Sequence, residues 1–451
     1  MPEKKYNLIT PLQRFLRKVI SGSMLLFLAT VVAVIIANSS ANEWYNQFLS
    51  YQIHFQIGSI SLFSHHGHNL TVLQFINDAL MALFFFLIGL EIKREVLVGE
   101  LSSLRRASLP IVAALGGMIV PVLLFFFICD QEPASAGIAI PMATDIAFAL
   151  GVLSLLGKRV PTGMKIFLMA LAVVDDIGGI LVIALFYGGE VSVGPLMTAF
   201  ALLALIYVGG KKGISTKYFY YIFGFVVWMM FLESGVHPTI AGVLLGFTVP
   251  ARPKFDTNYF VCNMRAALDE LPFGCEAQSN HAIVLTHKQI HVLKHIESMA
   301  DKTISPLQTI VDDLEQLVHY LVLPMFAFVN AGITFGNLEL SLAGIPIAIF
   351  SGLFVGKTVG IFLFSYLFLK IGLVKIPEGM NLKNLFAVAM LGGIGFTVAI
   401  FIANLSYAEI PEVGAALLNE AKLGVIAGSL ISGIAGFFML KKTLPPLPKK
   451  D

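Results

Sequence analysis

Long apolar stretches separated by short polar segments set the pattern of this chain. Most stretches last for the roughly 17–25 residues that an α-helix needs to cross the hydrocarbon core of a membrane. Membrane β-strands are shorter and alternate in polarity, so a barrel is not expected. The pattern predicts twelve membrane-spanning helices, near residues 15–37, 72–92, 107–128, 135–157, 163–187, 193–209, 217–233, 236–250, 312–332, 341–369, 383–405 and 420–440. The range 236–250 is shorter than usual.

Two of the predicted helices are interrupted near their middle. The fourth contains Pro141, which removes a backbone donor, followed by Thr144 and Asp145. The eleventh contains a glycine cluster at residues 392–395. Because lipid cannot hydrogen-bond the freed backbone groups, both breaks must face protein or a water-filled cavity. We therefore expect helices 4 and 11 to be discontinuous and to cross.

Each interrupted helix is the middle member of a set of three. Helices 3–5 span about 107–187, and helices 10–12 span about 341–440. The chain crosses the membrane an even number of times before the first set and an odd number of times before the second. The two sets therefore have inverted topology. Paired interruptions in inverted repeats indicate a transporter binding site. We expect an all-α integral membrane protein in which residues 1–451 form a single polytopic transporter domain.

Composition agrees with a membrane protein. Of the 451 residues, 57% are hydrophobic and only 13% are charged, whereas a soluble domain has about 25% charged residues. Nothing in the charge distribution suggests a nucleic-acid partner; the expected surroundings are membrane lipid. Three cysteines do not make a disulfide framework.

The distribution of lysine and arginine predicts the orientation. The first loop, residues 38–71, contains neither residue, whereas the second contains Lys93, Arg94, Arg105 and Arg106. The alternation continues along the chain, and basic loops mark the cytoplasmic side. Both termini should then be cytoplasmic. The run 15–37 could also be read as a signal peptide, but its length and the spans that follow favour an uncleaved helix.

Two loops are longer than the others. The first external loop contains the partly alternating stretch Tyr51–Phe63, with Gly58 at a turn position, which predicts an external hairpin at about 45–65. The internal segment 251–311 is polar and helical in pattern, and it joins the two halves of the bundle.

Two adjacent aspartates, Asp175 and Asp176, lie in the middle of the fifth predicted helix. A charged side chain at the bilayer centre costs about 2.5–3.5 kcal/mol even on lenient scales, so both need partners in protein or water. Neighbouring residues on a helix point about 100° apart. The two carboxylates should therefore make different contacts, in cation binding and in proton transfer.

The broken helices add an acid and a base to this pair. Half-helices that meet at mid-depth present partly positive and partly negative ends. Asp145 lies at one break, and Lys357 is the base deep inside the tenth predicted helix. Na⁺ and Li⁺ are hard cations that prefer oxygen ligands. Because a carboxylate can bind a cation or a proton, the two would compete at this site.

Several stretches together resemble the NhaA family of sodium/proton antiporters. They cover nearly every predicted span from the second onward: ALMALFFFLIGLEIKREV (79–96), AIPMATDIAFALGVLSLLG (139–157), ALAVVDDIGGI (170–180), SGVHPTIAGVLLGF (234–247), LPMFAFVNAGI (323–333), GKTVGI (356–361) and GGIGFTVAIFIA (392–403). This family is a known example of inverted repeats with discontinuous helices, so the resemblance implies the same architecture here.

The resemblance implies a role for each matching residue. Asp176 would be the main ligand of Na⁺ or Li⁺, and Asp175 would accompany it and pair with Lys357. Thr144 and Asp145 would mark the helix crossing, where Asp145 and Lys357 compensate the helix ends. Residues matching a regulatory set would link activity to pH: Glu91, Arg94, Glu95 and His237.

The resemblance also implies the activity of the whole protein. The chain would be an electrogenic, pH-regulated antiporter of the bacterial inner membrane that extrudes sodium in exchange for protons, in Na⁺ and pH homeostasis. It would be no enzyme, need no cofactor and form a homodimer through the external hairpin. The chain departs from the family's pattern at residues 311–317, VDDLEQL, where acidic residues are present but at shifted positions. The family's pH-sensing roles in this stretch therefore cannot be assigned to particular residues here.

Other functions remain open at this point. The chain could transport another solute, such as a bile acid or an anion, on a related fold. Such a transporter would be expected to have a basic binding site, but Lys357 is the one base predicted to be buried. An intramembrane aspartyl protease could use Asp145 and Asp175, but its expected G-x-G-D signature is absent. A channel would show a cation flux that no opposing proton gradient drives.

Overall fold

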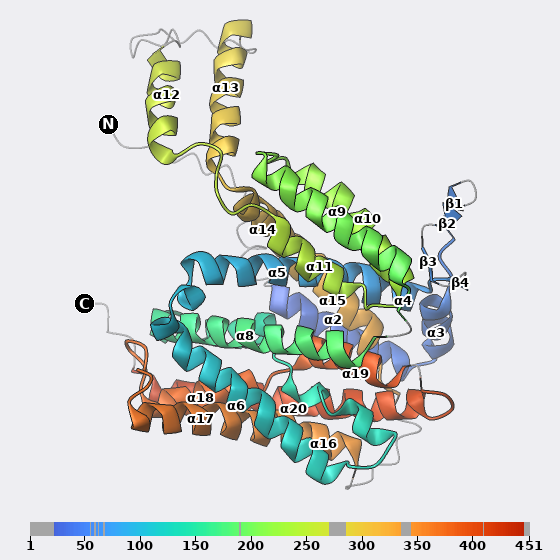
Figure 1. Ribbon diagram of the computed structural model, residues 1–451. Helices are drawn as coiled ribbons and strands as arrows, with labels where there is room; N and C mark the ends of the chain where they lie inside the picture. Colours follow the sequence, from blue (N-terminus) through green and yellow to red (C-terminus); the bar gives the residue numbers. More distant parts are fainter. Residues whose placement is uncertain are drawn as a thin grey trace.

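The structure, a computed structural model, describes residues 22–54, 56–57, 60–61, 63–65, 68–188, 191–269, 286–334, 344–408 and 410–445. Most helices run side by side along one direction, and short strands gather at one end of the bundle (Figure 1). Residues 15–21 of the first predicted span lie outside the described residues. Residues 341–343 of the tenth also lie outside them, and within the described residues each predicted range overlaps a helix or a series of helical segments.

The first half of the bundle contains α2 (Gly22–Ala37), α3 (Asn42–Ser50), α4 (Val72–Phe75), η1 (Ile76–Leu80), α5 (Met81–Val98), η2 (Glu100–Ser102), α6 (Leu104–Ile128), η3 (Ala134–Gly137), η4 (Ile140–Met142), α7 (Ile146–Ser154), η5 (Gly157–Arg159) and α8 (Thr162–Phe186). The middle of the chain contains α9 (Val193–Lys211), α10 (Lys217–Ser234), α11 (Thr239–Thr248), α12 (Thr257–Asp269) and α13 (His287–Thr303). The last part contains α14 (Pro306–Leu317), η6 (Val318–Val322), α15 (Leu323–Asn330), α16 (Ile345–Ser351), η8 (Gly352–Gly356), α17 (Lys357–Ile371), α18 (Leu382–Gly392), α19 (Phe396–Tyr407) and α20 (Gly414–Thr443).

Among the described residues, six helices are long and apolar enough to cross a membrane, or up to nine if each bent pair is one span. The six are Val72–Val98, Leu104–Ile128, Thr162–Phe186, Val193–Lys211, Ile345–Ile371 and Gly414–Thr443. Large apolar side chains lie exposed on these helices, such as Phe127, Leu185 and Phe438. An exposed apolar surface of this kind is suited to lipid rather than to water.

The two predicted breaks are present. Ala134–Met142 and Ile146–Ser154 are bent by 42° at one break, and Leu382–Gly392 and Phe396–Tyr407 are bent by 42° at the other. The first half of the fourth predicted helix is less regular than expected, because it consists of the 3₁₀ segments η3 and η4 around Pro141. At the second break, a Cβ on Gly395 would lie 3.0 Å from the carbonyl oxygen of Ala143. Glycine there lets the two breaks approach closely.

Three helices contain a π-helical turn, which the sequence pattern did not predict. The turns are η1, between α4 and α5, η6, between α14 and α15, and η8, between α16 and α17. Such turns inside α-helices occur frequently at functional sites. Here η1 contains Asn77 and Asp78, and η8 ends directly before Lys357.

Glycines allow the close packing of α5 against the short helix α11. A Cβ on Gly89 would lie 2.7 Å from the carbonyl oxygen of Val243, and a Cβ on Gly246 would lie 2.8 Å from the carbonyl carbon of Gly89. Small residues at such contacts are typical of membrane helices. Lys93 of α5 then donates to the carbonyl oxygens of Phe247, at 2.8 Å, and Val249 at the end of α11.

The strand-bearing end differs in detail from the predicted hairpin. Strands β1 (Gln56–Ile57) and β2 (Ile60–Ser61) form one antiparallel pair, and β3 (Ser64–His65) and β4 (His68–Asn69) form a second. Residues 45–50 belong instead to α3, since buried Tyr45 anchors that helix by donating to the carbonyl oxygen of Phe328 at 2.6 Å. Gly58 lies outside the described residues.

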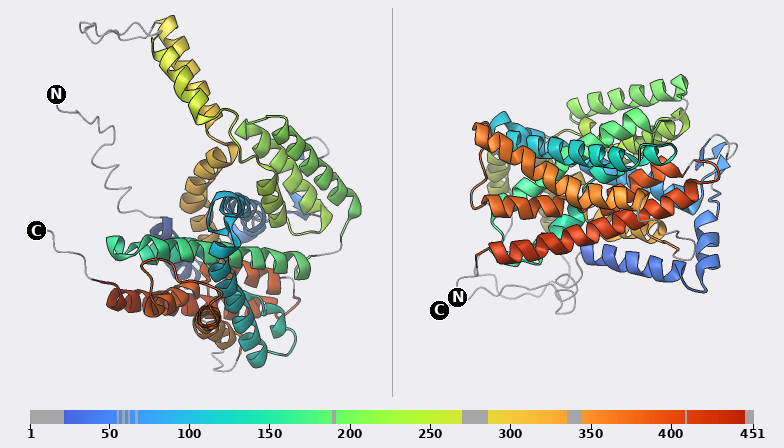
Figure 2. Two further views of the ribbon diagram at one scale, coloured as in Figure 1. Left: turned by 60° about the vertical axis from the view of Figure 1, so that its left-hand side comes forward. Right: turned by 90° about the horizontal axis from the view of Figure 1, so that it is seen from below.

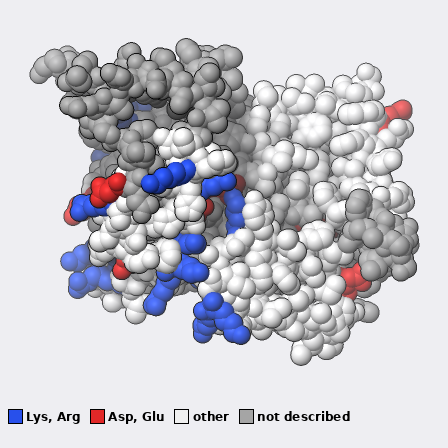
Figure 3. Space-filling model, turned by 90° about the horizontal axis from the view of Figure 1, so that it is seen from above, with Lys and Arg blue, Asp and Glu red and all other residues white. Residues whose placement is uncertain are grey.

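At the opposite end, α12 and α13 form a helical hairpin that projects from the bundle (Figure 2). They belong to the segment 251–311, of which residues 270–285 lie outside the description. Lysine and arginine side chains gather towards one end of the molecule (Figure 3). Arg159 of η5 is bound there to the end of α20. It donates to the carbonyl oxygens of Lys441, at 2.9 Å, and Leu444, at 2.6 Å.

Candidate ion-binding site

The two broken helices meet at their breaks. The backbone N–H of Asp145, just before α7, donates to the carbonyl oxygen of Ile394, between α18 and α19, at 2.6 Å. Thr144 and Asp145 are buried, with 1% and 2% of their surfaces exposed. The crossing is therefore in the interior, away from lipid.

One carboxylate serves the amino-terminal ends of both half-helices. Asp145 Oδ1 accepts from the N–H of Phe148 in α7 at 2.9 Å. Its Oδ2 accepts from the N–H of Thr397 in α19 at 3.1 Å and from the Thr397 hydroxyl at 2.6 Å. The first N–H groups of a helix have no partner within the helix, and that end is partly positive. A negative side chain at this point satisfies both requirements.

A second acceptor supports the start of α19. The Ser429 hydroxyl, from α20, accepts from the N–H groups of Gly395 at 3.2 Å and Phe396 at 3.1 Å. The amino-terminal end of α19 is thus held from two neighbouring helices. No lipid or water is needed to satisfy these buried groups.

A base and a hydroxyl serve the carboxyl-terminal ends. Lys357 Nζ donates to the carbonyl oxygen of Met142, which ends η4, at 2.6 Å. The Thr144 hydroxyl lies 3.1 Å from the carbonyl oxygen of Gly392, which ends α18. Carboxyl-terminal ends are partly negative, so the positive charge of Lys357 is favourable there.

The aspartate pair of α8 faces this crossing. Asp175 Oδ2 lies 3.0 Å from Lys357 Nζ and 2.6 Å from the Thr144 hydroxyl. Lys357 also donates to that hydroxyl, whose single hydrogen is therefore available for Asp175 or for Gly392. Side chains of two other segments, Lys357 of α17 and Thr144 at the first break, thus converge on Asp175.

Two oxygens of the pair are buried without a protein donor. Asp175 Oδ1 and Asp176 Oδ2 have no hydrogen-bond partner within the described part of the chain. Only 2% of Asp175 and 5% of Asp176 are exposed. Buried polar atoms normally have a partner, so such atoms require an explanation. Oxygens of this kind suit a hard cation or a proton.

A cavity of about 1520 Å³ leads towards the crossing from the strand-bearing end. Its lining includes Asn69 of β4 and nearby Thr71, and also Met142, Val182 and Phe401 from the helices. The carbonyl oxygen of Met142 is the one that accepts from Lys357. The cavity therefore reaches a residue that contacts the buried base.

The residues matched to a regulatory set lie in two places. Glu91, Arg94 and Glu95 lie on the part of α5 away from the cavity, whereas His237 lines the cavity between α10 and α11. Glu91 interacts electrostatically with Arg94, Glu95, Glu315 and His319, and Asp176 interacts with Glu91. The structure thus adds Glu315 and His319, from α14 and η6, to the acidic cluster on α5.

Sequence reasoning missed two residues of the crossing. Neither Thr397 nor Ser429 was among the site residues predicted from the sequence. A signal existed for Thr397, because it lies two residues after the glycine cluster, in the first turn of the helix that begins there. Ser429 is distant in sequence, so only the packing of α20 against α19 reveals it.

Broken helices that cross beside buried acids, inside a bundle of membrane-length helices, define a secondary transporter. The chain belongs to the family described as Na⁺/H⁺ antiporter 1, whose sequence profile matches residues 13–440. The predicted family resemblance is confirmed. A member of this family is a multi-pass inner-membrane transporter and not an enzyme.

Several relatives named Na(+)/H(+) antiporter NhaA are similar over almost their full length. The one from Parabacteroides distasonis is 58% identical over 97% of both chains. The one from Bacteroides fragilis is 52% identical, over 94% of this chain and 96% of the relative. The one from Bacteroides thetaiotaomicron is 49% identical, over 98% of this chain and 100% of the relative.

Proposed function

We propose that this chain exchanges Na⁺ or Li⁺ for protons across the bacterial inner membrane. The observation that carries the proposal is the buried pair Asp175 and Asp176, with one unpartnered oxygen on each carboxylate among the described residues. The names of the relatives support the same exchange. The physiological result would be sodium extrusion and control of internal Na⁺ and pH.

Asp176 is the principal ligand of the cation, because its Oδ2 has no hydrogen bond from the described residues. Asp175 supplies Oδ1 as a second ligand, since its Oδ2 already contacts Lys357 and Thr144. Protonation removes the negative charge that attracts the cation. Protons and Na⁺ therefore compete for the same carboxylates, and binding one releases the other.

Lys357 couples the crossing to the acid pair. Its Nζ contacts Asp175 Oδ2 and the carbonyl oxygen of Met142 in η4. A cation at Asp175 competes with Lys357 for that carboxylate, so the ion and the half-helix are linked through one side chain. More than one titrating group per cation makes the exchange electrogenic.

Twelve spans, with inverted repeats at about 107–187 and 341–440, allow access from alternate sides. The repeats rock against each other around the crossing, as in other inverted-repeat transporters. The end rich in lysine and arginine is cytoplasmic, as are both termini. The cavity then opens to the outside.

Regulation by pH involves the group on α5. Within this group, Glu91 lies close enough to Arg94, Glu95, Glu315 and His319 to interact electrostatically with each of them. A change of charge in this group alters the field at Asp176, because Glu91 interacts with Asp176. His237 contributes separately, from the cavity side.

The external hairpins β1–β2 and β3–β4 form the contact of a homodimer. Short hairpins at one end of a bundle leave strand edges that a second copy can cover. Beyond membrane lipid and the second copy, the exchange requires no resident cofactor, since the transported ions are the substrates.

Proton flux in everted vesicles tests the exchange. A proton gradient is established, and Na⁺, Li⁺ or K⁺ is added over a pH series. We expect Na⁺ and Li⁺ to collapse the gradient, with an apparent KM for Na⁺ that rises as the pH falls. The rise approaches about tenfold per pH unit where one proton competes. Flux without any cation, or a KM that is independent of pH, would contradict the proposal.

A further inference from the structure

The external cavity has an acidic side chain of its own. Asp78 is the one carboxylate among the described residues that line it, and no lysine or arginine lines it within that part of the chain. The exchange mechanism above does not use Asp78. Its position in the lining of the cavity, which also reaches Met142 beside the buried base, suggests a function along the path of the ion.

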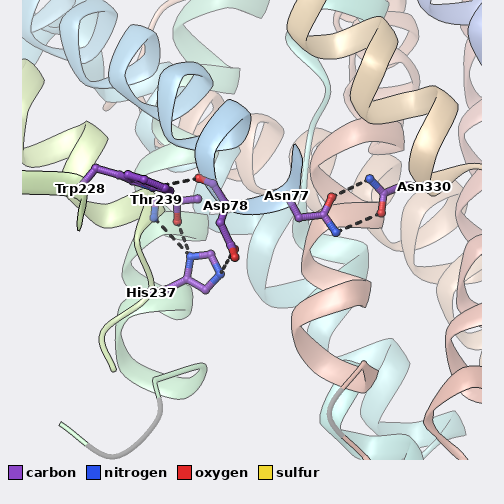
Figure 4. A network of polar contacts seen from close by, with 6 residues as sticks. All are labelled: Asn77, Asp78, Trp228, His237, Thr239 and Asn330. Carbon is purple, nitrogen blue, oxygen red and sulfur yellow. Dashed lines mark hydrogen bonds and ion pairs between the residues drawn. The ribbon is translucent and has the colours of Figure 1, made fainter. Parts of the chain in front are cut away.

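The π-helical turn η1 holds Asp78 on a rigid wall. Neighbouring Asn77 and Asp78 point to opposite sides of the helix (Figure 4). Asn77 exchanges two hydrogen bonds with Asn330 of α15, at 2.7 Å and 3.3 Å, and Asn404 of α19 donates to Asn330 at 2.9 Å. On the other side, Trp228 of α10 donates to the backbone carbonyl oxygen of Asp78 at 3.3 Å. Two helices, α15 and α10, thus hold the turn, and α19 supports the first of these contacts.

The Asp78 carboxylate faces the ring of His237, with 3.9 Å between Oδ1 and Nε2 (Figure 4). The N–H of Thr239 donates to His237 Nδ1 at 3.4 Å. The Thr239 hydroxyl also lies 2.7 Å from Nδ1, so Thr239 fixes the ring with Nε2 towards Asp78. About 20% of the Asp78 side chain remains exposed to the cavity.

We propose that Asp78 forms an external subsite for a hard monovalent cation, where Na⁺ is held between the buried aspartates and the outside. The inference rests on the proposed function. A cavity with low-dielectric walls and one sign of charge focuses the electric field and raises the local cation concentration. Carboxylate and water oxygens are suitable ligands for Na⁺.

The test measures the apparent KM for Na⁺ from each face of the full chain in liposomes. Exposed Cys262, on α12, reports the orientation through an impermeant thiol reagent. For Asp78→Asn we expect about a fivefold higher KM when Na⁺ is added at the strand-bearing face, the effect of one charge at about 4 Å in water. The KM at the α12–α13 face should stay unchanged, which also shows that the variant is folded.

Two further variants sharpen the test. Asp78→Glu keeps the charge and should keep the wild-type KM at both faces. Asp130→Asn removes an exposed carboxylate that does not line the cavity and should change neither KM. An unchanged KM in Asp78→Asn, or an equal rise from both faces, overturns the subsite while wild-type exchange stands. A wild type without Na⁺-driven proton movement overturns the proposed function, and the subsite with it.

Discussion

At the scale of single residues, the contacts of the two aspartates differ although the residues are adjacent. Asp175 contacts Lys357 and Thr144 through Oδ2, whereas Asp176 Oδ2 has no donor among the described residues. The expectation that the pair would make different contacts came from the 100° angle between neighbours on a helix. The partners themselves lie at the start of α17 and just after η4, so they depend on the fold.

The Lys357→Ala variant should be destabilised. Removing the base leaves Asp175 Oδ2 and the carbonyl oxygen of Met142 buried with one donor fewer. Breaking a buried ion pair costs about 3–5 kcal/mol. Thermal unfolding of the detergent-solubilised protein measures the loss. Lys370→Ala, at the exposed end of the same helix, should leave the unfolding temperature almost unchanged; equal behaviour of the two variants would contradict this account.

At the scale of elements, the two breaks could be predicted because Pro141 and the glycines at 392–395 disturb a helix locally. The caps were only partly predictable. Asp145 is adjacent to its break, but Ser429 reaches Gly395 and Phe396 from another helix. The π-helical turns were not predicted, because INDAL and GLFVG have the same apolar pattern as a regular helix. Tertiary packing decides such features, and local pattern does not record it.

The cap on α19 yields a matched pair of variants. Ser429→Ala removes the acceptor of two buried N–H groups, and loss of such a cap costs about 0.5–2 kcal/mol. Ser432→Ala, one turn further along α20, removes a hydroxyl that has no hydrogen-bond partner among the described residues. We expect a lower unfolding temperature and slower exchange for Ser429→Ala alone. Equal losses in both variants would show that the cap is unimportant.

At the scale of the whole molecule, the bundle has two chemically different ends. One has the strand pairs and the cavity rim, and the other has the projecting α12–α13 hairpin (Figure 2). The alternation of charge along the sequence predicted this polarity, since basic loops recur after every second crossing. The second strand pair and helix α3 were not predicted, because their sequence is only weakly periodic.

Labelling of cysteine tests the orientation. In a Cys275→Ser background, an impermeant thiol reagent should label exposed Cys262 in everted vesicles but not in intact cells, if α12 is cytoplasmic as proposed. Cys129 is buried and should not interfere. A cysteine introduced as Gln47→Cys, exposed on α3 at the other end, should give the reverse pattern. The same labelling pattern for both positions would exclude the proposed topology.

The central claim is that the buried carboxylate of Asp176 binds the transported cation. Asp176→Asn keeps the shape of the side chain but removes its charge. The decisive measurement is Na⁺-driven proton flux in everted vesicles that contain equal amounts of inserted wild type and variant. The account predicts that the Na⁺ response disappears in Asp176→Asn and persists in Asp130→Asn. A normal Na⁺ response in Asp176→Asn would contradict it.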